Sequence, residues 1–159
     1  MKIIDTKEYV SMLKELVEDG KEVSLIISGG SMTPFLGDRR DFIYFQKPDR
    51  ELKKGDMVFY QRDSGQYIMH RIYKIKPEGY YMVGDAQQEI EGPLRRDQIF
   101  ALITKVKRKG KIIGPGNFWW VFFEKFWINM VPVRRVIMKI YGTFKSKNDQ
   151  CKLLTERKN

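Results

Sequence analysis

A serine in a glycine-rich turn is the first residue of this sequence that could do chemistry. Ser31 follows Gly29 and Gly30, precedes Pro34, and comes shortly after an apolar run over residues 23–27. Glycine adopts backbone angles that a Cβ disfavours and proline fixes the direction of the chain, so the pattern predicts a serine presented on a loop. Such a turn alone is typical of an ordinary connection. Ser31 becomes a candidate nucleophile only with a base and an orienting group.

A base and a carboxylate are present further along the chain. His70 is the only histidine and lies in an alternating, strand-like stretch over residues 67–75. Asp85 follows Gly84 at the end of another such stretch. An imidazole pKa of about 6.5 suits a general base, and a carboxylate can hold its second nitrogen. Lys74 shares a strand face with His70 and is a rival base, although an exposed lysine is largely protonated at pH 7.

Four segments resemble, in order, the boxes of the signal peptidase I and LexA-like serine peptidase superfamily. They are SGGSMTPFL (28–36), KKGDMVFYQ (53–61), YIMHRIYKI (67–75) and YYMVGDAQ (80–87). With their flanks they cover about residues 22–107. The resemblance implies a serine endopeptidase that cleaves an extended peptide or preprotein at small residues. It implies no cofactor, and one histidine with one cysteine predicts no metal site.

The resemblance also gives each catalytic residue a role. Ser31 is the expected nucleophile. His70 stands where bacterial members carry lysine and where members resembling endoplasmic reticulum, archaeal or sporulation-associated enzymes carry histidine, which implies a Ser-His mechanism. Asp85 matches the aspartate of the family's GDN box and is expected to orient the imidazole. The asparagine that usually follows is absent here, which leaves Glu89 as an alternative carboxylate.

Oxyanion and substrate contacts are expected around the same turn. The backbone N–H of Ser31 is the expected oxyanion donor. The hydroxyl of Ser28 is a second candidate, because the family's serine two positions before the nucleophile is missing here. Met32 and Phe35 beside the nucleophile, with Met57 from a nearby strand, are expected to form the walls of a pocket for small side chains.

An amphipathic helix is predicted before the first strand. Asp5 and Glu8 form a capping pattern, and Gly20 ends the helical periodicity. The expected core-facing residues are Tyr9, Met12, Leu13, Leu16 and Val17. We expect this face to pack on the sheet.

Short apolar runs separated by turn sequences predict the strands that position the candidate site. They cover residues 23–27, 42–45, 57–60, 67–75, 80–83 and 99–106. This spacing predicts a mainly β fold, a coiled sheet or partly open β-barrel, which agrees with the LexA/signal peptidase type that the resemblance implies. Lys54-Gly55-Asp56 is interpreted as a structural turn, and Lys109-Gly110-Lys111 as a hairpin tip.

The composition changes after residue 114. Eleven of the fourteen residues over 118–131 are apolar, which is too short a run to span a bilayer. A helix there could cover the sheet with its aromatic side chains, or lie in a membrane interface, or do both with different faces. Basic residues follow it: Arg134, Arg135, Lys139, Lys145 and Lys147. We therefore expect a β domain over 1–114, an aromatic and basic helical extension over 115–145, and a polar tail over 146–159.

The charge balance favours an anionic partner. Thirty Lys and Arg residues against twenty Asp and Glu residues give a net charge of +10. An anionic membrane surface, reached through residues 118–147, is preferred to nucleic acid. The N-terminal sequence resembles neither a secretory signal nor a membrane span, which predicts a cytoplasmic or peripheral membrane location.

Two other functions compete with the peptidase. The first is a non-catalytic basic module that uses the same fold to bind a membrane surface or nucleic acid. The second is a self-cleaving repressor of the LexA type. The repressor is disfavoured because only thirty residues precede Ser31, which leaves no room for a DNA-binding domain, and because no Ala-Gly pair occurs upstream.

Overall fold

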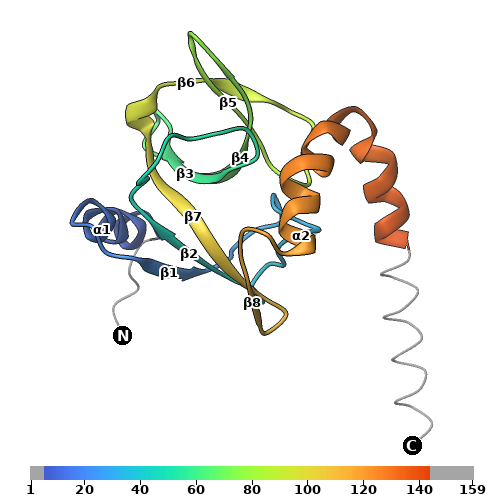
Figure 1. Ribbon diagram of the computed structural model, residues 1–159, viewed down its shortest axis with the longest axis horizontal. Helices are drawn as coiled ribbons and strands as arrows, with labels where there is room; N and C mark the ends of the chain where they lie inside the picture. Colours follow the sequence, from blue (N-terminus) through green and yellow to red (C-terminus); the bar gives the residue numbers. More distant parts are fainter. Residues whose placement is uncertain (1–5, 144–159) are drawn as a thin grey trace, which may run out of the picture.

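The computed structural model describes residues 6–143, and within them one antiparallel sheet lies between an N-terminal and a C-terminal helical segment (Figure 1). Asp5, Lys145, Lys147 and the predicted polar tail over 146–159 lie outside the described residues. The expected mainly β fold, with a helix before the strands and an aromatic, basic helix after them, is confirmed.

The elements follow one another in this order: α1 (Thr6–Glu18), β1 (Val23–Ile26), β2 (Phe42–Gln46), β3 (Met57–Gln61), β4 (Tyr67–Lys76), β5 (Gly79–Val83), β6 (Glu91–Leu94), the 3-10 turn η1 (Arg96–Gln98), β7 (Ile99–Arg108), β8 (Lys111–Ile113), α2 (Phe118–Val121), the π-helical turn η2 (Phe122–Phe126) and the 3-10 helix η3 (Trp127–Val133). Residues 134–143 are again helical. All six predicted strands are present, with ends within two residues of those expected.

Two strands were not predicted from the sequence. β6 contains Gly92 and Pro93, which weaken a strand pattern, and β8 is only three residues long. The hairpin tip between β7 and β8 is confirmed. Lys109 and Gly110 form it with φ of 48° and 82°, as a two-residue turn with both central residues at positive φ requires.

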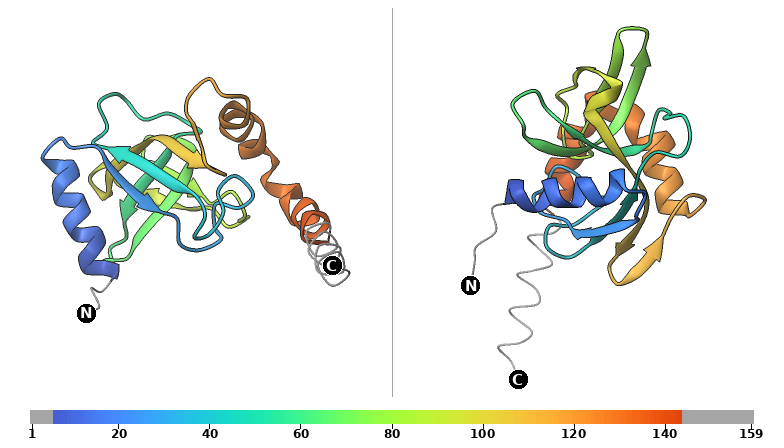
Figure 2. Two further views of the ribbon diagram at one scale, coloured as in Figure 1. Left: turned by 90° about the horizontal axis from the view of Figure 1, so that it is seen from below. Right: turned by 90° about the vertical axis from the view of Figure 1, so that its left-hand side faces the viewer.

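The sheet runs in the order β1-β2-β7-β3-β4-β5-β6, with β8 added on β7, and it does not close. It coils strongly, as Figure 2 shows. Although three strands separate β1 from β4 in the sheet, residues 25–27, at and just after the end of β1, and the turn that follows line the same groove as residues 67–70 of β4. The coiling therefore brings together segments that are far apart in the sequence.

Helix α1 packs on this sheet with a slightly different face from the one predicted. Leu13 and Val17 are buried as expected, and Val10 is buried beside them. Met12 is 48% exposed, so its assignment to the core was wrong. It lies at the margin of the apolar stripe, where the helix surface turns away from the sheet.

The C-terminal helical segment covers the core with one of its faces. Trp120, Phe123 and Trp127 are buried, and the rings of Phe35 and Phe123 lie 4.9 Å apart. Gly55 allows the segment to approach the turn before β3, because an added Cβ would lie 2.6 Å from atoms of Glu124. The expected packing of the aromatic helix on the sheet is confirmed for this face. No helix among residues 6–143 is both long and apolar enough to cross a bilayer.

Candidate active site

The turn that carries Ser31 is fixed at two points. Gly29, with φ of 93°, donates its N–H to a carboxylate oxygen of Asp38 at 2.8 Å. The carbonyl oxygen of Ser31 accepts the N–H of Ala86 at 2.8 Å. At Gly84 an added Cβ would lie 2.7 Å from the same oxygen, so a side chain is excluded there. Backbone contacts thus hold the Ser31 turn against the loop after β5.

Ser31 and His70 line one groove of about 900 Å³, between the end of β1, the start of α1 and the start of β4. Its apolar lining includes Val10, Leu25, Ile27, Met32, Phe59 and Met69. Within residues 6–143 the Ser31 hydroxyl makes no hydrogen bond to His70 or to any other group. Contacts between a nucleophile and its base often tighten only when substrate binds.

A chain of hydrogen bonds, buried at His70 and Tyr60 and half-buried at Glu91 and Arg62, holds the imidazole of His70. Its Nδ1 lies 3.1 Å from the hydroxyl oxygen of Tyr60, which donates to a carboxylate oxygen of Glu91 at 2.7 Å. Arg62 binds both oxygens of Glu91, at 2.6 and 2.7 Å. The four side chains form a relay that ends in an ion pair.

The relay determines which nitrogen of His70 carries the proton. The pKa of Tyr60 is raised, first by burial and then by its bond to Glu91, so the phenol keeps its proton and donates it to the carboxylate. The pKa of Glu91 is lowered chiefly by Arg62, which keeps the acceptor ionised. His70 must then donate its Nδ1–H to the Tyr60 oxygen. Its Nε2 is left unprotonated, as a general base requires.

Burial also keeps this imidazole neutral. The side chain is 5% exposed, and desolvation lowers the pKa of His70 to about 4. The negative charges of Glu91 and Asp85 act in the opposite direction and the positive charge of Arg62 in the same one, each with a smaller effect. His70 is therefore neutral at pH 7, which is the protonation state that a general base needs.

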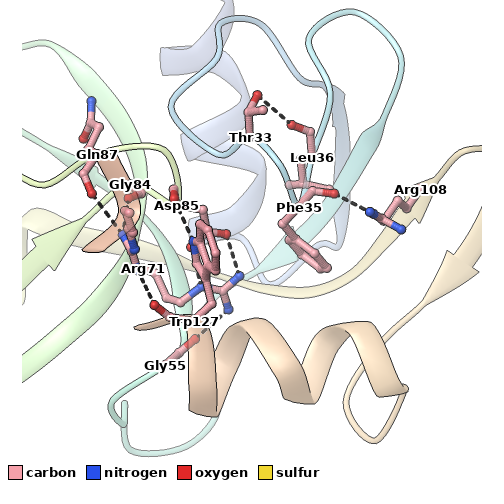
Figure 3. A network of polar contacts seen from close by, with 11 residues as sticks. Thr33, Phe35, Leu36, Gly55, Arg71, Gly84, Asp85, Gln87, Arg108 and Trp127 are labelled. Atoms are coloured by element: carbon pink, nitrogen blue, oxygen red, sulfur yellow. Dashed lines mark hydrogen bonds and ion pairs between the residues drawn. The ribbon is translucent and has the colours of Figure 1, made fainter. Parts of the chain in front are cut away.

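The carboxylate of Asp85 binds Arg71 instead of the imidazole of His70, which its predicted role requires. Its carboxylate oxygens accept two hydrogen bonds from Arg71, at 3.1 and 3.0 Å, and both side chains are almost completely buried (Figure 3). Its carbonyl oxygen accepts the indole N–H of Trp127 at 2.8 Å. Because Tyr60 holds His70 Nδ1, the prediction that Asp85 orients the imidazole was wrong. An aspartate after a strand does not reveal which basic side chain it meets.

The two alternatives to these roles also fall outside the groove. Glu89 lines a second hollow with Arg135 and Lys139. Lys74 is exposed whereas His70 is buried, because the β4–β5 register shifts between Ile72 and Lys74. Such a bulge breaks the alternation from which a shared face was predicted.

Of the residues predicted to bind the oxyanion or the substrate, some line the groove and others do not. Ser28 and Met32 line the groove with Ser31, in agreement with the prediction. Phe35 and Met57 are buried in the main core, away from the groove lining, so their assignment to the pocket was wrong. Phe35 instead packs against aromatic rings of the C-terminal segment. Asp56 binds Arg50 and confirms the structural turn expected there.

Tyr60, Glu91 and Arg62 were not identified from the sequence, although the position of Tyr60 next to His70 could have been inferred. Tyr60 pairs with Ile68 and Val58 with His70, so Tyr60 and His70 are diagonal neighbours on the β3–β4 hairpin. The turn between β3 and β4 sets the register of the hairpin, and a register predicted from that turn would have placed Tyr60 beside His70. Glu91 belongs to the unpredicted strand β6 and left no such signal.

The chain matches no protein-family model, no curated protein and no solved structure with which it was compared. What the site can do therefore follows from its own geometry. A serine with an unbonded hydroxyl and a neutral imidazole of fixed tautomer face one groove, a combination suited to acyl transfer. The backbone N–H of Ser31 is also unbonded within the described chain and can serve a developing oxyanion.

We predict that Asp85→Asn destabilises the protein by about 3–5 kcal/mol, because it leaves the buried guanidinium of Arg71 without its counter-charge. Urea unfolding measures this. Asp63→Asn is the matched control, since it breaks an ion pair between largely exposed side chains and should barely change stability. Unchanged stability of Asp85→Asn, with a loss of catalysis alone, would restore Asp85 as a partner of the imidazole.

We predict that the single histidine titrates at about pH 4 in the folded protein. Glu91→Gln should lower this pKa further, because the charge of Glu91 favours the imidazolium. Glu89→Gln is the control and should leave it unchanged. Proton NMR of the imidazole signals measures all three values, and an equal effect of both substitutions contradicts the relay.

The same shift predicts the pH dependence of stability. The unfolded chain binds this proton at about pH 6.5, and the folded chain only at about pH 4. The contribution is complete above pH 6.5 and is lost as the pH falls toward 4, so the free energy of unfolding should decrease over that interval. His70→Asn should remove this part of the pH dependence in urea unfolding.

Proposed function

We propose that this protein is a serine endopeptidase similar to signal peptidase I, with a sheet of the LexA type and a Ser-His mechanism. The observation that carries the proposal is the shared groove. Ser31 and His70 lie 39 positions apart in the sequence, yet they line one groove with the second imidazole nitrogen already held by Tyr60. The four ordered motifs support it independently. A cytoplasmic or peripheral membrane location is part of the same proposal.

Each catalytic step uses a group of this groove. The Ser31 hydroxyl attacks the scissile carbonyl carbon while Nε2 of His70 takes its proton. The backbone N–H of Ser31 stabilises the oxyanion, with the Ser28 hydroxyl as a second donor. The imidazolium then protonates the leaving amine, and the acyl group stays on Ser31. Water, deprotonated by the same nitrogen, hydrolyses the ester and releases the second peptide.

The relay supports this cycle in its charged intermediate. When His70 becomes an imidazolium, its Nδ1–H stays bonded to Tyr60, and the ionised Glu91 lies directly behind. Glu91 raises the pKa of His70 against the effect of burial. Tyr60 and Glu91 therefore act as positioning residues, since they act through the imidazole.

The edge of the sheet offers a place for an extended substrate. Within residues 6–143, β1 pairs with β2 on one side only, and residues 25–27, at and just after its end, line the groove together with the following turn. A peptide added along this edge would satisfy its free backbone groups and pass beside Ser31. The resemblance implies cleavage at small residues.

We predict that Ser31→Ala and His70→Ala each lower peptide hydrolysis by about 1,000-fold or more. Ser31→Ala should preserve the melting temperature, whereas His70→Ala should also lower it, because it removes a buried side chain that binds Tyr60. Cleavage of a peptide library, read by mass spectrometry, measures the rates. Ser64→Ala is the matched control, because Ser64 lines the same groove on the β3–β4 turn and has no catalytic role. Activity that survives in Ser31→Ala contradicts the proposal and favours a non-catalytic basic module.

A further inference from the structure

Exposed apolar side chains gather at the C-terminal end of the described chain. Thirteen large apolar residues are exposed among those described, and eight of them lie within residues 112–141. They are Ile112, Phe118, Trp119, Phe126, Val133, Val136, Ile140 and Tyr141. Single exposed apolar residues are ordinary, but a concentration of this kind marks an interaction surface.

Four of the aromatic side chains form a continuous stripe along α2 and η2. The ring of Phe122 is stacked with those of Phe118 and Phe126, with centroids 6.4 and 6.3 Å apart. Trp119 stands edge-on to Phe118 at 5.3 Å. Phe118, Trp119 and Phe126 are 71%, 46% and 62% exposed. We call these four residues the aromatic stripe.

The opposite face of the same segment is anchored in the core. Trp120, Phe123 and Trp127 alternate with the stripe and are buried. Figure 1 shows this segment beside the sheet, with the helix over residues 134–143 turning back after it. The stripe is therefore presented on a rigid support.

The exposed charged residues of the C-terminal segment that carries the stripe all have one sign. The exposed charged residues over 111–143 are Lys111, Lys125, Arg135 and Lys139. The acid of this segment, Glu124, is only 12% exposed and pairs with Lys53 at 3.2 Å. The guanidinium of Arg108 lies 5.1 Å from the ring of Trp119. A partner must therefore accept aromatic rings and positive charge together.

We propose that this face docks on the surface of an anionic lipid bilayer. Phenylalanine and tryptophan are favoured at the boundary between headgroups and acyl chains, where the stripe would lie. The lysines and arginine around it would approach the anionic headgroups, each adding to the attraction. Nucleic acid would match the charge but would leave the phenylalanine rings in water. A lipid surface satisfies both features of the face.

Docking would also bring the groove close to the membrane. Gln87 lines both the groove of Ser31 and the hollow that contains Arg135, Met138 and Lys139. The helix that carries these cations thus adjoins the candidate active site. This consequence rests on the proposed function: the peptidase would meet peptides that are themselves at the bilayer surface.

The test is co-sedimentation of the full chain with phosphatidylcholine vesicles, with and without phosphatidylglycerol. We expect binding that is at least tenfold stronger to the anionic vesicles and that weakens with salt. Phe118→Ser with Phe126→Ser should reduce it at least tenfold at an unchanged melting temperature. Ile75→Ser is the control, since Ile75 is also exposed but lies on β4, away from the stripe.

A second pair of variants tests the charge. Lys125→Glu with Lys139→Glu should abolish the preference for anionic vesicles, whereas Lys74→Glu on β4 should not. No binding by the wild type, or equal binding by the stripe variant, overturns the proposal. Self-association in sedimentation velocity that the stripe variant loses would assign the face to a second copy of the chain instead. Vesicle binding needs no catalysis, so Ser31→Ala should bind normally even if the peptidase proposal fails.

Discussion

The ion pair between Arg71 and Asp85 is the contact on which the rest of the structure depends. It is almost completely shielded from water, and both carboxylate oxygens and three guanidinium nitrogens are satisfied, the third by the carbonyl oxygen of Gly55 at 2.9 Å. Such a pair offsets its desolvation only when its geometry is complete. The carbonyl of Asp85 also holds the Trp127 indole, so the turn before β3, strand β4, the loop after β5 and the C-terminal segment meet at one point (Figure 3). That loop in turn holds the carbonyl of Ser31 through Ala86.

Strand β4 carries both Arg71 of the central ion pair and His70, the candidate base. His70 and Arg71 are consecutive, and a strand directs consecutive side chains to opposite faces. Arg71 forms the ion pair on one face of β4, and His70 lies toward the groove on the other. Both side chains are buried. The burial that lowers the pKa of His70 thus follows from the packing that fixes the strand. The negative charge of Glu91 offsets part of the effect of burial on the pKa of His70, and Tyr60 orients the imidazole.

Local patterns predicted six of the strands and the turns, whereas the pairing of Ser31 with His70 was expected from the resemblance, and the structure places both on one groove. Local patterns could not predict which charges would pair across the fold. Arg71 follows His70 directly, yet only the closed sheet shows that it takes the carboxylate of Asp85. Glu91 joins the relay from β6, a strand that was not predicted because Gly92 and Pro93 weaken its sequence pattern. A single bulge was enough to move Lys74 off the face expected for it.

Ser31 is proposed to be a nucleophile activated by His70, the one histidine of the chain. The most direct measurement uses a peptide boronate, which forms a tetrahedral adduct with an activated serine and leaves the neighbouring imidazole protonated. Boron and proton NMR follow the two events in the same sample. We expect a tetrahedral boron signal together with a downfield Nδ1–H signal from His70, both absent in Ser31→Ala. A tetrahedral boron signal that persists in Ser31→Ala, or that forms while the imidazole stays neutral, would contradict the account.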